Sequence, residues 1–185
     1  YHSLSSINSI SKIISDKKNL KKNTSFSDYT LSPTVCFNCF EELKKRNIKK
    51  NLKISAIANC YRYESMNYKT LERLRVYLMR EYIFFGDKKF VSNQLKKYLL
   101  LIKKILISFK IKFRIVNAND PFFKDDQVSK KLFQNANELK FEFQVYIPFE
   151  KKWLAVASVN NHLDTLSKSY KIKNNQKVVN SGCIG

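Results

Sequence analysis

The chain has 185 residues, and its 35 Lys and Arg residues against 15 Asp and Glu residues give a formal net charge of +20. A charge this large is typical of a protein with a polyanionic partner. Because 44% of the residues are hydrophobic and 14% are aromatic, the composition excludes a disordered basic tail. The length predicts a single globular domain with its own core.

Lysine makes up most of the positive charge, since only six of the basic residues are arginine. Together with the many Asn, Ile and Ser residues, this is the composition that an AT-rich coding sequence produces, so the net charge by itself is weak evidence for nucleic-acid binding. Phosphate recognition favours the planar fork of arginine. Four of the six arginines lie between positions 62 and 80, which makes this segment the first candidate for a binding site.

The N-terminal part is rich in Ser, Lys and Asn, and residues 1–30 are expected to form a helix and loop apart from a core of residues 31–185. A Ser/Pro/Thr cluster then predicts a short helix over Val35–Arg46. Apolar residues alternate with small or polar ones over Leu52–Tyr63 and again over Arg75–Phe85. This alternation predicts a long antiparallel hairpin with a mobile tip.

Gly86 and Asp87 end this hairpin and begin a long helix, Lys88–Phe109. Strands outnumber helices in the rest of the chain and follow one another without βαβ alternation. The expected class is therefore α+β, a mostly antiparallel sheet with helices on one side of it. The further predicted strands are Ile111–Ala118, Leu139–Pro148, Trp153–Asn160 and Lys177–Ser181.

Four lysines of the long helix recur at a seven-residue spacing and so share one helical face, which predicts an amphipathic helix covering a sheet rather than a membrane span. No signal-peptide pattern opens the chain. We therefore expect a cytoplasmic protein with no membrane partner. The chain begins at Tyr1 without Met and stops at Gly185, and it is expected to be a fragment, incomplete at both ends. The lysines are Lys96, Lys97, Lys103 and Lys104.

Arg62 and Glu64 are two residues apart in a predicted strand, so their side chains point to the same face of the sheet. Arg73 or Arg75 reaches that face from the returning strand. Such a face could hold a nucleotide, with Arg62 as a fork on a phosphate and Glu64 accepting a hydrogen bond from an exocyclic amine. A cross-strand ladder of salt bridges explains the same spacing, and the spacing alone leaves both interpretations open.

The four cysteines are too few and too scattered for a disulfide scaffold in a chain of this length. Cys36 and Cys39 form a CxxC motif, which could be half of a structural zinc site or a redox pair, but no second CxxC and no paired histidines complete a tetrahedral site. Cys60 is expected to be a buried small residue. His162 could act as a base, although a lone histidine after a strand is more often a hydrogen-bonded structural residue. Three loop acids could bind Mg²⁺ or be solvated: Asp120, Asp125 and Asp126.

The region from Arg62 to Tyr82 contains Arg-x-Glu, a polar loop, an arginine and a run ending Met-Arg-Glu-Tyr. This arrangement resembles motif 2 of the class II aminoacyl-tRNA synthetases. Within that class the chain resembles the amino acid:[carrier protein] ligases, which are truncated homologues of atypical seryl-tRNA synthetases. The resemblance implies a class II catalytic core that is cut within motif 3. Five further stretches resemble the family in the same order, the last being the opening of motif 3: Leu31–Phe37, Ala118–Phe123, Glu138–Phe143, Ser158–Asp164 and Gly182–Gly185.

The resemblance implies a zinc site formed by Cys36, Glu81 and Cys183, because the carrier-protein ligases and the zinc-dependent seryl enzymes have their metal ligands at these positions. Three protein ligands leave one position open, which is typical of a functional zinc. A Lewis acid there can take the amino group of a substrate amino acid. Glu142 is a weaker metal or substrate candidate, because it faces the same region in the resembled fold.

The resemblance also implies ATP as a substrate, with Mg²⁺ beside it. Arg62 would contact the α-phosphate as a catalytic residue, Glu64 would accept from the adenine amine, and Arg73 with Leu74 would contact the nucleotide, although the choice between Arg73 and Arg75 stays open. Activation of a carboxylate on ATP consists mainly of positioning and charge neutralisation. Four residues would line the nucleotide side: Ala155, Val156, Ala157 and Ser158.

The implied reaction is adenylation of glycine or alanine, followed by transfer to the phosphopantetheine thiol of a carrier protein. Glu81 would be catalytic through the metal that binds the amino acid. Carrier proteins are acidic, so a basic face suits this partner as well as RNA. The full-length protein is expected to be a homodimer, as class II synthetases are through motif 1.

Two other functions stay open. The first is a catalytic fragment of a seryl-type tRNA synthetase, which would have the same fold but tRNA as its acceptor. The usual seryl motif has an arginine pair after the position of Asp164, whereas this chain has Thr-Leu-Ser-Lys-Ser-Tyr there, which argues against tRNA. A non-catalytic, synthetase-derived nucleic-acid-binding module would use the lysine excess. Because the chain stops before the motif 3 arginine that neutralises the ATP phosphates, this piece alone is expected to be inactive.

Overall fold

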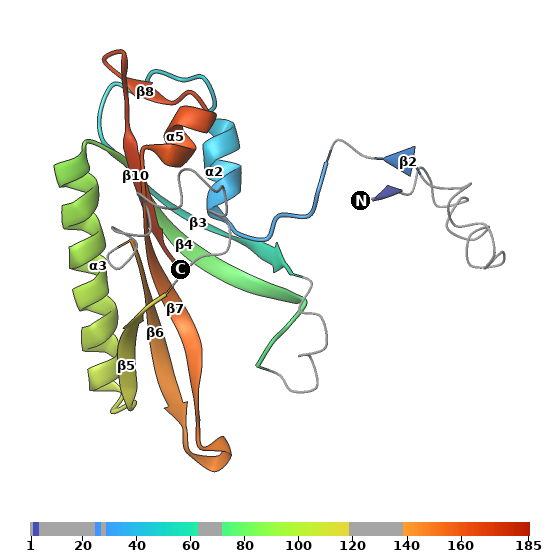
Figure 1. Ribbon diagram of the computed structural model, residues 1–185, viewed down its shortest axis with the longest axis vertical. Helices are drawn as coiled ribbons and strands as arrows, with labels where there is room; N and C mark the ends of the chain where they lie inside the picture. The colour runs from blue at the N-terminus through green and yellow to red at the C-terminus, as the bar shows by residue number, and fades with distance from the viewer. Residues whose placement is uncertain (1, 4–24, 27–28, 63–71, 119–138) are drawn as a thin grey trace. The chain divides into compact units, whose positions relative to one another are not determined.

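A computed structural model describes residues 2–3, 25–26, 29–62, 72–118 and 139–185 of the chain (Figure 1). The predicted hairpin tip and the loop acids lie outside these residues.

The chain divides into two compact units, Tyr1–Ser32 and Pro33–Gly185. In the first unit, β1 (His2–Ser3) pairs antiparallel with β2 (Ser25–Phe26), where the sequence predicted a helix and a loop. The expected boundary of the catalytic core at residue 31 stays a prediction.

The second unit is built on a six-stranded sheet in which every neighbouring pair of strands is antiparallel. The expected α+β class with an antiparallel sheet is thereby confirmed. In spatial order the strands are β3 (Leu52–Tyr61), β4 (Val76–Gly86), β10 (Asn180–Ile184), β7 (Lys152–Leu163), β6 (Lys140–Ile147) and β5 (Phe113–Asn117). The last strand of this sheet in the chain lies between β4, which comes much earlier in the sequence, and β7, so the C-terminal segment forms the middle of the sheet (Figure 1).

Helices cover both faces of this sheet, whereas the sequence analysis expected them on one side. The long helix α3 (Lys88–Ser108) packs on one face, and the short helices α2 (Cys36–Glu42) and α5 (Thr165–Ser169) pack on the other (Figure 1). Strand β4 supplies both cores, because Phe84 points toward α3 while Ile83 and Phe85 point toward α2. The expectation was wrong because the pattern of apolar residues predicts that a helix such as α2 packs on the sheet but not which face of the sheet it covers.

The long helix begins and ends where the sequence predicted, within one residue. Its N-cap is Asp87, whose Oδ1 accepts a hydrogen bond of 2.8 Å from the Phe90 backbone N–H. Val91 and Leu95 are buried under the helix, while the four lysines at seven-residue spacing are exposed. None of the helices in the described part of the chain is long and apolar enough to cross a membrane.

The predicted strand Lys177–Ser181 proves to be two elements. Residues 177–178 form β9 (Lys177–Val178), which pairs with β8 (Lys173–Asn174), and β10 begins only at Asn180. The two residues between β8 and β9, Asn175 and Gln176, have φ values of 47° and 66°. Two successive positive φ values are typical of a tight hairpin turn, which residue type alone did not reveal because neither position is glycine.

The other boundaries differ by a few residues from the predicted ones. The helix predicted over Val35–Arg46 ends at Glu42, and Lys45 follows with a φ of 61°, outside the helical region. Strand β3 ends two residues before Tyr63. A three-residue 3₁₀ helix, η4 (Pro148–Glu150), joins β6 to β7.

Candidate active site

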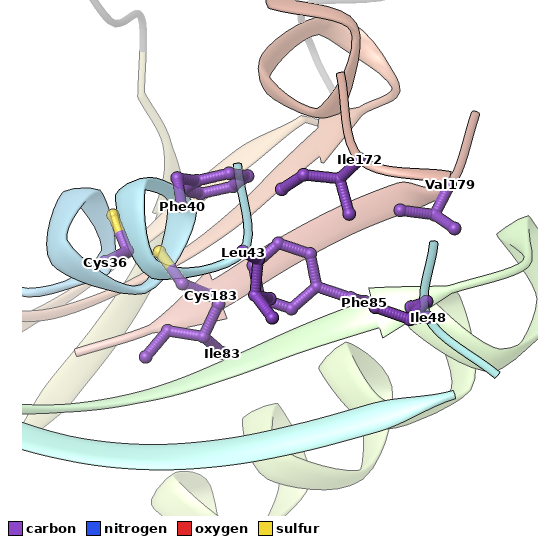
Figure 2. Packing of buried hydrophobic residues seen from close by; sticks show 9 residues of the cluster. All are labelled: Cys36, Phe40, Leu43, Ile48, Ile83, Phe85, Ile172, Val179 and Cys183. Carbon is purple, nitrogen blue, oxygen red and sulfur yellow. The ribbon is translucent and has the colours of Figure 1, made fainter. Parts of the chain in front are cut away.

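Three buried side chains from three separate elements converge on the face of the sheet that α2 covers. Cys36 is the first residue of α2, Glu81 lies in the middle of β4, and Cys183 lies on β10. Their sulfur and carboxylate oxygen atoms all lie within 4.8 Å of one another. Figure 2 shows Cys36 and Cys183 at one end of a buried cluster that also contains Phe40 and Ile83. The three residues are those that the resemblance implied as metal ligands.

Among the described residues, Glu81 is held through one of its two carboxylate oxygens. Thr34 Oγ1 donates a hydrogen bond of 2.7 Å to Glu81 Oε1 and lies 3.3 Å from Cys36 Sγ. Glu81 Oε2 is buried and has no hydrogen-bond partner among the residues that the structure describes. A buried carboxylate oxygen without a partner costs free energy, so this atom indicates a missing cation or donor.

The donor set of this cluster fits zinc. Two thiolates and one carboxylate are ligands that Zn²⁺ accepts, and three protein ligands leave the fourth tetrahedral position open. The pKa of the Cys183 thiol lies well above its ordinary value because Cys183 hydrogen-bonds to Cys36, is buried, and lies near the charges of Cys36 and Glu81. The Cys183 thiol is therefore hard to ionise here on its own, and a divalent cation at this position would favour its thiolate form.

The other two cysteines lie outside the cluster. Cys39 lies one turn further along α2, and it does not belong to the single group of described residues that could hold a metal. Burial, followed by the charges of Cys36 and Glu81, raises the pKa of the Cys39 thiol. Cys60 is fully buried, as expected, and burial is the largest cause of its raised thiol pKa. All four cysteines are free.

His162 contacts the cluster from β7. Its Nε2 lies 3.5 Å from Cys183 Sγ, and its Nδ1 lies 3.3 Å from Ser181 Oγ. The residue as a whole is half-buried, but both ring nitrogens contact buried residues, and burial lowers the His162 pKa from 6.5 to about 4. The imidazole is therefore neutral at neutral pH, which agrees with a hydrogen-bonded structural residue.

Arg62 lies directly after β3, on the same face of the sheet as the cluster. Its guanidinium carbon is 5.4 Å from the ring centroid of Tyr77, and Tyr77 shares a face of β4 with Glu81. Its Nε donates a hydrogen bond of 3.0 Å to the Pro33 carbonyl oxygen, next to Thr34. The Arg62 backbone N–H donates to the Arg75 carbonyl oxygen at 2.9 Å and so continues the hairpin beyond β3.

The other predicted nucleotide residues are only partly placed on that face. Arg73 and Leu74 are exposed before β4 begins, and Glu64 lies outside the described residues. Of the four predicted residues on β7, Ala157 packs against the core under α3, and the expectation that all four line the nucleotide side stays a prediction. Side chains normally alternate between the two faces along a strand. Here Phe143 pairs with Ala157 and Gln144 pairs with Ala155, so one extra residue of β7 interrupts the alternation.

The remaining three are Ala155, Val156 and Ser158, and Ala155 pairs with Gln144 of β6. Ser158 Oγ accepts a hydrogen bond of 3.0 Å from Asn160 Nδ2, and the Ser158 backbone exchanges hydrogen bonds with Gly185. Val156 is 49% exposed. Glu142 pairs with Ser158 across the strands, and its Oε1 lies 3.5 Å from Lys140 Nζ in a half-buried ion pair, so its role as a metal or substrate candidate stays a prediction.

Comparison with known proteins identifies the family. The model of the tRNA synthetase class II core domain (G, H, P, S and T) matches residues 20–185. The chain belongs to the class II tRNA synthetase core-domain family. The resemblance found in the sequence is confirmed.

Curated relatives of this class II core include carrier-protein ligases and tRNA ligases. The chain is 29% identical over 161 residues to an amino acid–[acyl-carrier-protein] ligase 1 of Bradyrhizobium diazoefficiens, covering 85% of this chain and 49% of the relative. It is 22% identical over 178 residues to a type-2 serine–tRNA ligase of Methanopyrus kandleri, covering 90% of this chain and 34% of the relative. The chain thus spans half or less of the length of these relatives.

Solved structures show the same core fold. The crystal structure of the M. kandleri seryl-tRNA synthetase in complex with A. aeolicus tRNASec matches with a TM-score of 0.78 at 20% identity, over 96% of this chain and 37% of that chain. The seryl-tRNA synthetase of Pyrococcus horikoshii, complexed with ATP, matches with a TM-score of 0.68 at 14% identity, over 86% of this chain and 37% of that chain.

Sequence reasoning missed three residues of this class II site: Thr34, Asn160 and Ser181. Thr34 stands two residues before Cys36, and Ser181 stands two residues before Cys183 on β10. On a strand, the spacing of Ser181 to Cys183 places both on one face and is a usable signal, whereas the spacing of Thr34 to the helical Cys36 is not. Their partners, however, come from other elements, so the sequence could not have paired them.

Proposed function

We propose that a protein carrying this core at the full length of its relatives activates a small amino acid, glycine or alanine, and transfers it to a carrier protein. The observation that carries the proposal is the buried cluster of Cys36, Glu81 and Cys183 with its unpartnered carboxylate oxygen. The carrier protein as acceptor is supported by two relatives, which are named as amino acid–[acyl-carrier-protein] ligases and are each 29% identical to this chain.

In the first step, a carboxylate oxygen of the amino acid attacks the α-phosphorus of ATP. The bond to the β-phosphate breaks, and pyrophosphate leaves. In the second step, the phosphopantetheine sulfur, having lost its proton, attacks the aminoacyl carbonyl carbon. AMP leaves with the electron pair, and the aminoacyl group becomes a thioester.

Cys36, Glu81 and Cys183 would hold a zinc ion. The bound ion would supply a Lewis-acid position for the amino group of the substrate. The chain itself prepares this site: Thr34 directs Glu81 by holding its Oε1, and the first turn of α2 brings Cys36 to the sheet.

Arg62 would contact the α-phosphate, because its stacking on Tyr77 and its bond to the Pro33 carbonyl hold the guanidinium beside the segment that precedes Cys36. A positioned arginine stabilises charge that develops on phosphate oxygens. Glu64 is proposed for the adenine amine and Arg73 with Leu74 for the nucleotide. Class II synthetases use ATP with Mg²⁺, so Mg²⁺ is part of the proposal.

The proposed acceptor is a carrier protein. We further propose that the full-length protein is a homodimer and that it is located in the cytoplasm. The net charge of +20 supports a negatively charged partner, because opposite charges attract. The alternative acceptor, tRNA, is also negatively charged. The absence of an arginine pair after Asp164 favours the carrier protein.

The test is ATP–pyrophosphate exchange by the full-length protein, measured with each amino acid in the presence of Zn²⁺ and Mg²⁺. We expect exchange with glycine or alanine, and charging of a phosphopantetheinylated carrier protein but not of tRNA in a second assay. Exchange with no small amino acid would overturn the proposal. Charging of tRNA alone would move the protein to the seryl-type alternative, and salt-sensitive RNA binding without exchange would identify a nucleic-acid-binding module.

A further inference from the structure

Cys183 Sγ has two polar neighbours on the adjacent strand. His162 Nε2 lies 3.5 Å from the sulfur, and Asn160 Nδ2 lies 3.6 Å from it. Asn160 pairs directly with Cys183 across β7 and β10. His162 is two residues further along β7, so both side chains reach the sulfur from the same face of the sheet.

His162 is held at its other nitrogen by Ser181. Ser181 is completely buried, and its Oγ lies 3.3 Å from His162 Nδ1. Ser181 and Cys183 are two residues apart on β10, so one strand carries both partners of the imidazole. The register shift of β10 against β7 between Ser181 and Gly182 lies at this point.

If Cys183 binds a metal, the loss of its thiol proton decides which ring nitrogen of His162 carries the hydrogen. A thiol that binds a metal loses its proton, so Cys183 Sγ can then only accept hydrogen bonds. His162 Nε2 must therefore carry the hydrogen and donate it. In a neutral imidazole the other nitrogen, Nδ1, then accepts, and the Ser181 hydroxyl is the donor.

We propose that His162 is a positioning residue for the metal: its Nε2–H donates to the Cys183 thiolate, and the Ser181 hydroxyl donates to Nδ1 in the same tautomer and so holds the ring. Asn160 Nδ2 is the second donor to the same sulfur. The inference rests on the proposed metal site and goes beyond it, because His162 is not one of the three residues whose ligand atoms lie within 4.8 Å of one another. Hydrogen bonds from outside the ligand set orient metal ligands and adjust their strength.

Ring packing is the competing explanation for a histidine at this position. The His162 ring centroid lies 5.8 Å from that of Phe40, which is completely buried. A ring that served only as packing could be replaced by phenylalanine without any effect on the metal. The test must therefore separate the shape of the ring from its Nε2–H.

Three variants make this separation in the full-length protein. His162→Phe keeps the ring and removes both nitrogens. His162→Gln places an amide nitrogen near the position of Nε2, and His162→Asn places one near Nδ1, so these two variants are matched in polarity and differ in which partner they reach. Each variant is loaded with Co²⁺, its affinity is measured by competition with a chelator, and its thiolate-to-cobalt charge-transfer band is recorded.

We expect His162→Phe and His162→Asn to bind Co²⁺ about 10- to 100-fold more weakly than the wild type, with the charge-transfer band moved to longer wavelength. The shift arises because a thiolate that loses a hydrogen bond gives up its electrons more easily. His162→Gln should restore both the affinity and the band position. Wild-type affinity and spectrum in His162→Phe would overturn the inference while leaving the metal site intact. Equal losses in the Gln and Asn variants would overturn it as well. A wild-type protein that binds no metal would overturn both this inference and the proposed metal site.

Discussion

Thr34 and Glu81 are joined by a hydrogen bond of 2.7 Å between Thr34 Oγ1 and Glu81 Oε1, across 47 positions of the chain. The bond connects a residue two positions before α2 to the middle of β4. It occupies one carboxylate oxygen and leaves Oε2 buried and without a hydrogen-bond partner in the described part of the protein. Thr34 thereby decides which oxygen of Glu81 is available to a cation.

Thr34→Val should weaken metal binding, because valine has the shape of threonine but cannot donate to Glu81. We expect a loss of about 10-fold in Zn²⁺ affinity and about 1–3 kcal/mol in the free energy of unfolding. Thr34→Ser keeps the hydroxyl and is the control, which should stay close to the wild type in both measurements. Equal behaviour of the Val and Ser variants in chelator competition and in denaturant unfolding would contradict this role of Thr34.

Cys36→Ser and Cys183→Ser should each lose most of the bound zinc, since a serine hydroxyl is a poor zinc ligand at neutral pH. Cys39→Ser is the matched control, because Cys39 lies on the same helix as Cys36 but outside the metal-binding group. Elemental analysis of the purified proteins measures the zinc content. Full zinc content in Cys36→Ser, with a loss in Cys39→Ser, would move the site to Cys39.

Arg62→Lys should impair the reaction with ATP although the positive charge is kept. Lysine has no planar fork and no Nε–H for the Pro33 carbonyl, and it stacks less well on Tyr77. We expect the rate of ATP–pyrophosphate exchange to fall roughly 10²-fold, the scale of losing one positioned donor to a developing charge. Arg80→Lys, on the opposite face of β4, is the control and should retain exchange. Normal exchange in Arg62→Lys would exclude Arg62 as the phosphate contact.

Asp87 should stabilise the protein in a pH-dependent way. The hydrogen bond from the Phe90 backbone N–H is the largest cause that lowers the pKa of the Asp87 carboxyl below its ordinary value of 3.8. Because the folded state holds the carboxylate more strongly than the unfolded state does, this stabilisation is complete above the unfolded pKa and is lost as the pH falls through the folded pKa.

Thermal unfolding of two Asp87 variants measures this effect. Asp87→Ala should lower the melting temperature at pH 7, and the difference from the wild type should shrink as the pH falls below 3.8 and through the lower pKa of the folded state. Asp87→Asn keeps a capping oxygen without a titrating group, so its difference from the wild type at pH 7 should be the smaller of the two. If the melting temperature of Asp87→Ala stays equally far below that of the wild type at low pH, the carboxylate charge contributes nothing to stability at this cap.

The strands and the long helix were predictable because their signals are local. The alternation over Leu52–Tyr61 and the Gly86–Asp87 helix start depend on neighbouring residues alone, and both agree with the structure. The β8–β9 hairpin and α5 were not predicted, because two-residue strands and a five-residue helix contain too few positions to show a period. The metal-site residues came from a resemblance to a family, and no periodicity in this chain would have grouped them.

By itself, the sequence determined the antiparallel character of the sheet, the capped amphipathic helix and the family to which the core belongs. The tertiary structure decided which side chains meet. Strand β10 inserts between β4 and β7, and only this order brings Cys183 beside Glu81 on one side and beside Asn160 and His162 on the other. Strand order is a property of the whole sheet, whereas sequence patterns report the conformation of one segment at a time. The relationship between the candidate ligands and the residues that support them therefore becomes visible only when the sheet is assembled.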